Sequence, residues 1–222
     1  MTTPVHEQFV QIPIDSTMLE GSLALPEHTH SLVVFAHGSG SSRFSPRNNF
    51  VARVLQREGI GTLLMDLLKE EEDAIYETRF DIDLLTDRLL LTTQWLREQP
   101  DTKQLVIGYF GASTGAAAAL KAAAIPAAIP AASSGSSIGA VVSRGGRPDL
   151  AEGALVYVQS PTLLIVGGND KAVLQLNRDA YKRLAGTKQL EIVPGATHLF
   201  EEPGALEEVA RLATEWFKQY LT

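Results

Sequence analysis

Two serines of the chain lie in the pattern G-x-S-x-G, which is typical of a serine nucleophile held on a sharp turn. Ser113 lies in "GASTG" at residues 111–115, and Ser137 lies in "GSSIG" at residues 135–139. A serine hydroxyl is a weak nucleophile until a base removes its proton, and the base in turn needs an acid that orients it. Because the pattern occurs twice, the flanking sequence has to identify the nucleophile.

The flanking segments favour Ser113. A nucleophile turn needs a strand immediately before it and a helix immediately after it, so that the helix N-terminus offers N–H groups to a developing oxyanion. Ser113 follows the apolar run "QLVIGYF" and precedes the Ala-rich "TGAAAALKAAA". Ser137 follows an Ala/Pro/Ser-rich loop and leads into the strand-like "GAVVS". We therefore predict that Ser113 is the nucleophile and that Ser137 is not.

His198 and Asp170 are the predicted partners of Ser113, because a strand–turn–helix nucleophile is followed in the chain by the acid and then by the histidine. Among five histidines, His198 alone follows Ser113, and it lies in "PGATHLF" after a strand-like segment. Asp170 lies in "GGNDKAV" at the carboxyl end of another predicted strand, where ligands meet open α/β sheets. Asp149, in "GGRPDL", is the alternative acid, although it could instead cap a short helix.

Two glutamates, Glu201 and Glu202, also lie close to His198 in the chain. We expect them in the first turn of the last helix, where acidic side chains are common, rather than against the histidine. They are weaker candidates than Asp170.

Two backbone N–H groups are predicted to hold the oxyanion, namely those of Thr114, which directly follows the nucleophile, and Ser39. Ser39 lies in the loop "FAHGSGSSRFSPRN", whose glycines let the backbone turn toward a substrate, and Gly38 is the alternative donor. His37 precedes Ser113 in the chain, so we expect it to shape this loop rather than to act as the base. The chain has no G-x-x-x-x-G-K-[ST] sequence, so a phosphate-binding P-loop is not predicted.

Two pairs of arginines follow strands that should end at the same edge as Ser113. Arg43 and Arg47 come after the HGSG loop, and Arg144 and Arg147 come after "AVVS". A guanidinium binds carboxylate or phosphate with two parallel hydrogen bonds. One hypothesis is that Arg43, Arg144 or Arg147 orients an anionic substrate; the alternative is that they form surface or structural salt bridges.

Strand-like and helix-like segments alternate along the chain and must position these residues. The predicted strands are 7–14, 20–26, 31–36, 61–67, 104–110, 139–143, 162–167 and 188–195, and the predicted helices are 46–58, 81–98, 114–124, 173–185 and 204–220. The first two strands alternate polar and apolar residues, as an antiparallel hairpin does, whereas the next five are apolar runs typical of buried parallel strands. The last strand is more polar, which places it nearer an edge.

This pattern predicts an α/β fold, with a mostly parallel sheet of about eight strands and helices on both faces. The short sequence between 139–143 and 162–167 leaves no room for a large lid, so we expect an open pocket for small substrates. The Ala/Pro/Ser-rich segment 122–137 is predicted to be a helix end followed by a loop.

Composition limits the remaining possibilities. The 222 residues suit one domain, 1–222, and the 26 acidic against 19 basic residues give a net charge of −7, which argues against nucleic acid or an anionic membrane as a partner. The absence of cysteine excludes disulfides, thiolate metal sites and a cysteine nucleophile.

The N-terminus does not have the pattern of a signal peptide, and Lys121 and two prolines interrupt the apolar run 116–132. We expect a cytoplasmic protein.

The motifs "FAHGSGSSR", "GYFGASTGAAAAL", "VVSRGGRPDL", "PTLLIVGGND" and "EIVPGATHLFEEPG" together resemble the α/β-hydrolases of the dienelactone-hydrolase-like group. More narrowly, the chain resembles the hydrolase unit that some bacteria fuse to a phosphoribosyltransferase. The resemblance covers nearly the whole chain and implies catalytic roles for Ser113, Asp170 and His198. Dienelactone hydrolases proper use a cysteine nucleophile, which this chain lacks, so the resemblance implies a serine carboxylesterase without phosphoribosyltransferase activity.

The sequence therefore predicts a serine hydrolase that cleaves a small carboxylic ester or lactone through an acyl-enzyme on Ser113. No metal or organic cofactor is expected. Thioesterase, dienelactone-type lactonase or peptidase activity would use the same residues and remains an alternative, as does a non-catalytic binding module on a hydrolase scaffold. The complete Ser–Asp–His order favours an enzyme. The sequence carries no signal for an oligomeric state.

Overall fold

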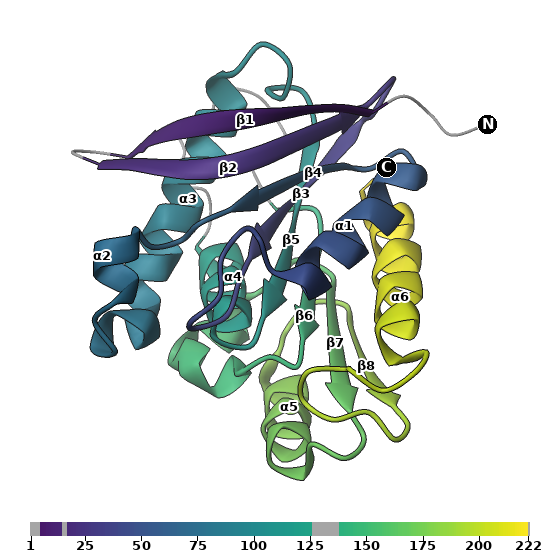
Figure 1. Ribbon diagram of the computed structural model, residues 1–222. Helices are drawn as coiled ribbons and strands as arrows, with labels where there is room; N and C mark the ends of the chain where they lie inside the picture. The colour runs from purple at the N-terminus through teal and green to yellow at the C-terminus, as the bar shows by residue number, and fades with distance from the viewer. Residues whose placement is uncertain (1–4, 15–16, 126–137, 222) are drawn as a thin grey trace.

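An eight-stranded sheet organises the chain (Figure 1). The structure is a computed structural model that describes residues 5–14, 17–125 and 138–221. The strands are β1 (Val5–Ile14), β2 (Thr17–Pro26), β3 (Ser31–Ala36), β4 (Gly61–Met65), β5 (Val106–Ala112), β6 (Val141–Arg144), β7 (Thr162–Gly167) and β8 (Lys188–Val193). Their order across the sheet is β1-β2-β4-β3-β5-β6-β7-β8.

The sheet is antiparallel at one end and parallel through the rest. β1 pairs with β2, and β2 with β4, in antiparallel register, whereas β4, β3, β5, β6, β7 and β8 are parallel neighbours. In β1 the side chains of Ile12 and Ile14 are buried while their neighbours are more exposed, which matches the alternating sequence. The predicted hairpin, the parallel core and the edge position of β8 are confirmed.

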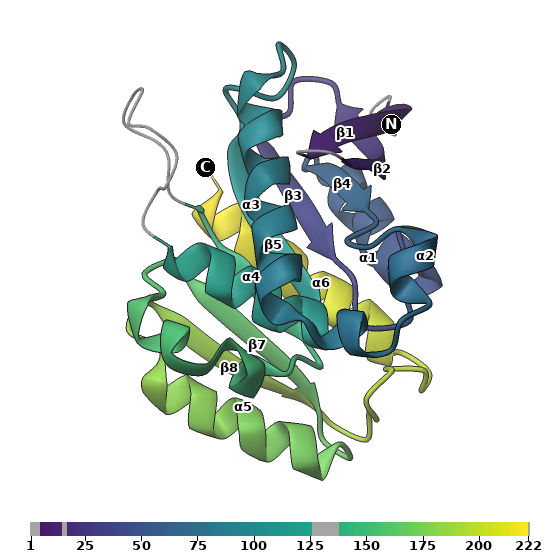
Figure 2. The ribbon, with the colours of Figure 1, turned by 90° about the vertical axis from the view of Figure 1, so that its left-hand side faces the viewer.

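Helices cover both faces of the sheet, as predicted (Figures 1 and 2). The main helices are α1 (Pro46–Arg57), α3 (Ile82–Glu98), α4 (Thr114–Ala124), α5 (Lys171–Arg183) and α6 (Ala205–Tyr220). α1 and α6 pack together on one face, and α3, α4 and α5 contribute to the core on the other face. The strands β3 and β5 to β8 run in one direction between these layers, so their carboxyl ends share one edge of the molecule.

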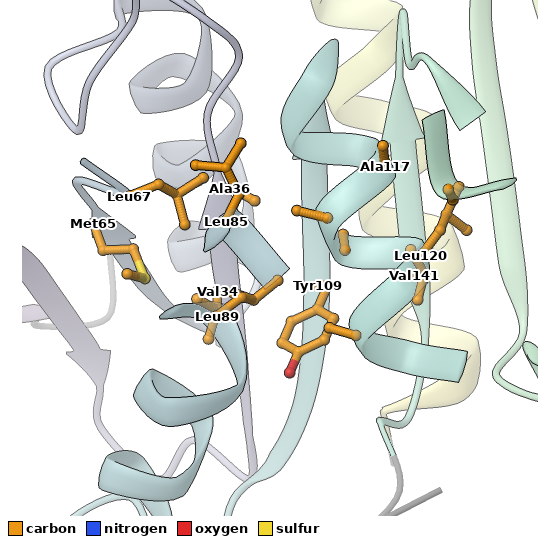
Figure 3. Packing of buried hydrophobic residues seen from close by; sticks show 14 of the residues in the cluster. Val34, Ala36, Met65, Leu67, Leu85, Leu89, Tyr109, Ala117, Leu120 and Val141 are labelled. Carbon is orange, nitrogen blue, oxygen red and sulfur yellow. The ribbon is translucent and has the colours of Figure 1, made fainter. Parts of the chain in front are cut away.

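Side chains of alternating residues in the central strands are buried in the two core layers on opposite faces of the sheet. In β3, Val34 and Ala36 face the α3–α4 layer, whereas Val33 and Phe35 face the α1–α6 layer. Figure 3 shows the first of these layers, where Leu89 of α3 lies beside Val34, Leu85 lies near Ala36, and α4 packs over Tyr109 and Val141. The alanines of α4 let the helix approach the sheet closely, which fixes the helix that begins at the candidate nucleophile.

Three short helices lie outside the predicted helices, although a short helix at Asp149 was one of the alternatives weighed from the sequence. They are α2 (Glu70–Asp73), η1 (Glu77–Phe80) and η2 (Pro148–Tyr157). Neither α2 nor η1 buries a residue, so neither carries the apolar periodicity from which a helix is inferred. Between β6 and β7 the chain forms only η2, in agreement with the expected absence of a large lid.

The prediction that Glu201 and Glu202 lie in the first turn of the last helix is wrong, because α6 begins only at Ala205, after Gly204 with φ 82°. A left-handed residue ends the preceding turn there, and glycine adopts that conformation without strain. Ser137 and most of the segment 122–137 lie outside the described residues.

Within the described residues, no helix combines the length and the apolarity needed to cross a lipid bilayer.

Candidate active site

Ser113 occupies the turn between β5 and α4, as the sequence predicts. Its backbone has φ 51° and ψ −119°, a combination that a non-glycine residue rarely adopts. Two backbone hydrogen bonds hold this turn: Ser113 N donates to the Arg144 carbonyl oxygen at 3.2 Å, and Arg147 N donates to the Ser113 carbonyl oxygen at 3.1 Å. The strained turn is therefore held by the last residue of β6 and by the segment that follows it.

The two glycines of the GASTG motif are required by close packing. A Cβ atom at Gly115 would lie 2.2 Å from the Ala36 carbonyl oxygen, and one at Gly111 would lie 2.4 Å from Ala116 Cα. Real Cβ atoms do not approach backbone atoms so closely, because the van der Waals repulsion is too large. The same holds less severely for Gly38, whose added Cβ would lie 3.0 Å from Ser113 Cβ. The HGSG loop thus lies directly against the serine.

His198 and Asp170 are brought together from two loops at the carboxyl edge. His198 Nδ1 lies 2.7 Å from Asp170 Oδ2, within hydrogen-bond distance. The other carboxylate oxygen, Oδ1, accepts a hydrogen bond of 3.4 Å from Val173 N and so caps α5. The side chain of Asp170 is 15% exposed and that of His198 is 38% exposed, so the histidine remains accessible while its acid is largely covered. The helix N-terminus stabilises the charged carboxylate.

The other acidic candidates have different partners. Asp149 receives two hydrogen bonds from Arg147, at 2.9 Å from Nε and 2.7 Å from Nη2. Glu201 contacts Arg47 at 3.2 Å, and Glu202 Oε1 accepts a hydrogen bond of 3.1 Å from Thr197 N. Of these carboxylates, Asp170 is thus the one that contacts His198. Glu202 instead bonds to the backbone of the loop that carries His198, a contact that no sequence motif predicts.

Ser113 and His198 both border the segment after β6. Gly145, with φ 52°, directly follows Arg144, whose carbonyl oxygen accepts the hydrogen bond from Ser113 N. A Cβ atom added to Gly145 would lie 3.6 Å from His198 Cε1. In the part of the chain that the structure describes, the Ser113 hydroxyl makes no hydrogen bond with the His198 ring. In many hydrolases this contact tightens only when a substrate binds.

The two residues predicted to supply the oxyanion donors, Thr114 and Ser39, are in contact with each other. Thr114 is the first residue of α4, so its N–H is one of the helix's first-turn donors without an intrahelical acceptor. Ser39 N lies close to it and donates a hydrogen bond of 2.8 Å to the Thr114 hydroxyl oxygen. Sequence reasoning named the backbone of Thr114 but missed its side chain, because the G-x-S-x-G pattern leaves that position unspecified.

His37 holds the HGSG loop in place, as expected. Its Nδ1 lies 3.0 Å from the Gly38 carbonyl oxygen, and its Nε2 accepts a hydrogen bond of 2.9 Å from Leu67 N. An Nε2 that accepts cannot carry a proton, so the ring is neutral and its Nδ1–H donates to Gly38. Burial lowers the pKa of His37 below its ordinary value, which is consistent with this neutral form.

The three candidate substrate arginines differ in their surroundings. Arg43 forms salt bridges with Glu20, at 2.6 Å, and with Asp66, and its guanidinium lies 4.2 Å from the centre of the Phe44 ring. Arg147 is paired with its neighbouring aspartate. For these two arginines, the structural salt bridge that the sequence left open as an alternative is formed.

Arg144 is buried and, within the described residues, has no salt bridge to a carboxylate. Its Nη2 donates a hydrogen bond of 3.1 Å to Asn48 Oδ1, and its guanidinium lies 5.9 Å from the centre of the Phe200 ring. Burial, with a smaller effect of the nearby Arg47, lowers its pKa to about 10. At neutral pH the side chain is therefore still a cation, on the residue whose backbone carbonyl accepts the hydrogen bond from Ser113 N.

A hollow of about 630 Å³ opens beside the HGSG loop. The residues that line it are Met18, Leu19, Glu20, Ser41, Ser42, Arg43, Phe44, Asp66, Leu68, Lys69, Glu70, Glu71 and Asp73. Carboxylates outnumber cationic groups in this lining, so the hollow disfavours an anionic group. No group of three or more His, Asp or Glu side chains within the described residues is arranged to hold a metal ion.

The chain is similar to several known proteins. A structure described as the dienelactone hydrolase of Anabaena variabilis is 52% identical, with a TM-score of 0.92 over 98% of this chain and 99% of that one. Two esterases share the fold at low sequence identity. Est1E of Butyrivibrio proteoclasticus is 17% identical, with a TM-score of 0.78 over 95% of this chain and 98% of that one. An esterase of Pyrococcus furiosus is 19% identical, with a TM-score of 0.75 over 98% of this chain and 92% of that one. No protein-family model matches the chain.

Curated relatives from Mycobacterium tuberculosis, which carry the provisional name phosphoribosyl transferase, are 54% identical over 218 residues. The match covers 98% of this chain and 47% of each relative, so the chain spans about half the length of the curated relatives it matches.

Proposed function

Because this chain belongs to the dienelactone-hydrolase-like group of the α/β-hydrolase family, we propose that it is a serine hydrolase that cleaves a small carboxylic ester or lactone. The observation that carries this proposal is the 2.7 Å contact between His198 and Asp170 at the sheet edge where Ser113 occupies its strained turn. A serine on such a turn, with a histidine oriented by a largely covered carboxylate at the same sheet edge, is the arrangement that acyl transfer requires.

The proposed reaction begins when His198 Nε2 takes the proton of Ser113 and the serine oxygen attacks the ester carbonyl. Asp170 fixes the ring so that Nδ1 carries the proton and Nε2 is free to accept one, and it stabilises the imidazolium that forms. The N–H groups of Ser39 and Thr114 hold the oxyanion. His198 then protonates the leaving alcohol, and water releases the acyl group by the same route, without a metal or organic cofactor.

The surroundings of the site support a small, largely uncharged substrate. Of the three arginines considered for an anionic substrate, Arg43 and Arg147 are neutralised by carboxylates, and the neighbouring hollow has a predominantly acidic lining. The buried charge of Arg144 remains the one argument for an anionic group. A comparison of kcat/KM for acetate and hemisuccinate esters of one alcohol decides this point, and we expect the neutral ester to be preferred.

The nucleophile separates this chain from dienelactone hydrolases with a cysteine. Serine is less nucleophilic than a thiolate and depends on its base, so we propose a carboxylesterase rather than a specialised dienelactonase. Thioesters and lactones would react with the same residues. The name of the Mycobacterium tuberculosis relatives refers to proteins about twice as long as the matched region, and phosphoribosyl transfer is not part of the proposal. We also propose that the protein is cytoplasmic, as expected from its sequence.

Labelling with a fluorophosphonate probe tests the proposed function without knowledge of the natural substrate. The probe phosphonylates an activated serine through the same attack that opens ester cleavage. We expect one label, on the peptide that contains Ser113, and loss of that label in Ser113→Ala and His198→Ala.

Asp149→Ala is the matched control, because this aspartate lies after the neighbouring strand but is paired with Arg147. It should label at close to the wild-type rate. A folded wild-type protein that takes no label would contradict the proposal and favour the non-catalytic binding module. Retention of label in Ser113→Ala would show that another residue is the nucleophile.

A further inference from the structure

The Thr114 hydroxyl lies where two oxyanion donors meet. Ser39 N, one of the two backbone donors, already points at Thr114 Oγ1, at 2.8 Å. Thr114 N, the other backbone donor, belongs to the same residue as that hydroxyl. The hydroxyl is therefore placed beside both groups that would hold the oxyanion, although the proposed function assigns it no role.

The hydroxyl has a proton to donate. Its oxygen accepts the hydrogen bond from Ser39 N, and no acceptor for its own O–H is found among the described residues. Thr114 is only 2% exposed, so water has little access to this group from outside. An O–H whose oxygen accepts an N–H bond is polarised by it and becomes a better donor. A buried hydroxyl with an unused proton beside an oxyanion site is a donor that lacks an acceptor.

Two further contacts fix the hydroxyl near the reacting atom. Gly38 lies against the nucleophile, since a Cβ atom added there would lie 3.7 Å from Ser113 Oγ. Ser39 is the next residue in the chain, and its N–H bond to Thr114 Oγ1 connects the Thr114 side chain to this loop. The rigid first turn of α4 sets the position of Thr114 from the other side.

We propose that the Thr114 hydroxyl is a third hydrogen-bond donor of the oxyanion hole. Before a substrate binds, its oxygen is the acceptor that satisfies Ser39 N. When the tetrahedral intermediate forms, rotation about the Cβ–Oγ1 bond turns the hydroxyl proton to the oxyanion, and Ser39 N shares its proton between the two oxygens as a three-centre bond. The N and Oγ1 atoms of one threonine are three bonds apart, close enough to donate to a single oxygen.

This inference rests on the proposed serine-hydrolase function and predicts a loss of transition-state stabilisation without a loss of substrate binding. Thr114→Val keeps the shape of the side chain and removes the hydroxyl, whereas Thr114→Ser keeps the hydroxyl. We expect Thr114→Val to lower the rate of fluorophosphonate labelling, and kcat for an activated ester, by about tenfold or more, with KM within about threefold. Thr114→Ser should retain most of both rates.

A tetrahedral inhibitor separates a donor from a purely structural role. A trifluoromethyl ketone forms an oxyanion on Ser113, so its Ki should rise in Thr114→Val in proportion to the fall in kcat/KM. Thr92→Val is the matched control for packing, because Thr92 is a buried threonine in α3 whose hydroxyl has no hydrogen-bond partner among the described residues. That variant should leave labelling, kcat and Ki unchanged.

Three results would overturn the inference. A Thr114→Val protein with wild-type or faster labelling would show that the hydroxyl only accepts the hydrogen bond from Ser39 N and does not help the reaction. Equal losses in Thr114→Val and Thr114→Ser would assign the effect to altered packing around the side chain, because only Thr114→Val removes the hydroxyl. A change in kcat with no change in Ki would assign the effect to loop position. Failure of the proposed function appears separately, as absent labelling of the wild type or full labelling of Ser113→Ala.

Discussion

At the scale of single residues, Asp170 performs two tasks with its two carboxylate oxygens. Oδ1 caps α5 through Val173 N, and Oδ2 contacts His198 Nδ1. The cap fixes the carboxylate on a rigid helix, and the fixed carboxylate orients the imidazole. A loop aspartate without the cap would be free to turn away, so the helix that follows β7 is part of the candidate site.

Asp170→Asn should keep the fold and lose most of the activity. An asparagine oxygen still caps the helix, but the amide favours the tautomer of His198 that cannot take a proton from Ser113. We expect kcat to fall by roughly 10³- to 10⁴-fold, with the far-UV circular dichroism and the melting temperature close to wild type. Asp149→Asn, which disrupts only the pairing with Arg147, should change kcat less than about twofold.

If Asp149→Asn were the more damaging of the two substitutions, the acid of the site would be Asp149, and the observed contact of Asp170 would be merely structural.

At the scale of elements, the carboxyl ends of β3 and β4 are joined by His37. Its ring spans from the Gly38 carbonyl to Leu67 N and so connects the HGSG loop to the loop that follows β4. Protonation of Nε2 would abolish the bond from Leu67, because a protonated ring nitrogen cannot accept. Asp66 and Asp73 lie near enough to favour the charged ring, but burial outweighs them and lowers the pKa.

This lowered pKa predicts a specific loss of stability in acid. Because the folded-state pKa lies below the unfolded value of about 6.5, the folded state binds fewer protons, and the contribution of His37 is complete above that pH. It is lost as the pH falls from about 6.5 through the folded pKa. Urea unfolding at several pH values should show a steeper decline for the wild type than for His37→Gln over this window.

The difference between the two proteins isolates His37 from the other four histidines. Parallel pH profiles would contradict the assignment of a neutral, buried ring.

At the scale of the whole molecule, two helices that lie far apart in the sequence are packed together. α1, which follows β3, contacts α6, which ends the chain, and both cover the same face of the sheet (Figure 1). Phe217 of α6 is fully buried and lies against Gly108 in the middle of the sheet, where an added Cβ would come within 3.0 Å of its ring. The C-terminal helix is therefore part of the core.

We predict that residues 1–222 unfold as one cooperative unit, with circular dichroism and tryptophan fluorescence following the same urea transition. Phe217→Ala should lower the free energy of unfolding by about 3–5 kcal/mol without splitting the transition. Two separate transitions, or a variant in which only the fluorescence shifts, would argue against a single domain. The exposed Tyr76→Ala is a suitable control and should have little effect.

The sequence by itself determined the order of strands and helices and the candidate nucleophile. The apolar runs predicted β3 and β7 with their observed bounds, since a strand buried on both faces tolerates few polar residues. Ser113 could be chosen over Ser137 because a strand before and a helix after are local features. The short helices α2 and η1 were not predicted, because they bury no residue and therefore show no apolar periodicity in the sequence.

Only the tertiary structure decided which side chains meet. It brought Asp170 to His198 across 28 residues of sequence and gave Asp149 to Arg147, although both aspartates follow strands of the same edge. It also paired Arg43 with Glu20 of β2 and with Asp66 after β4. The hydrogen bond from Ser39 N to the Thr114 hydroxyl oxygen likewise joins segments that are far apart in the sequence. Contacts of this kind depend on strand order and loop path, which are set by packing of the entire sheet and are not encoded in any local pattern.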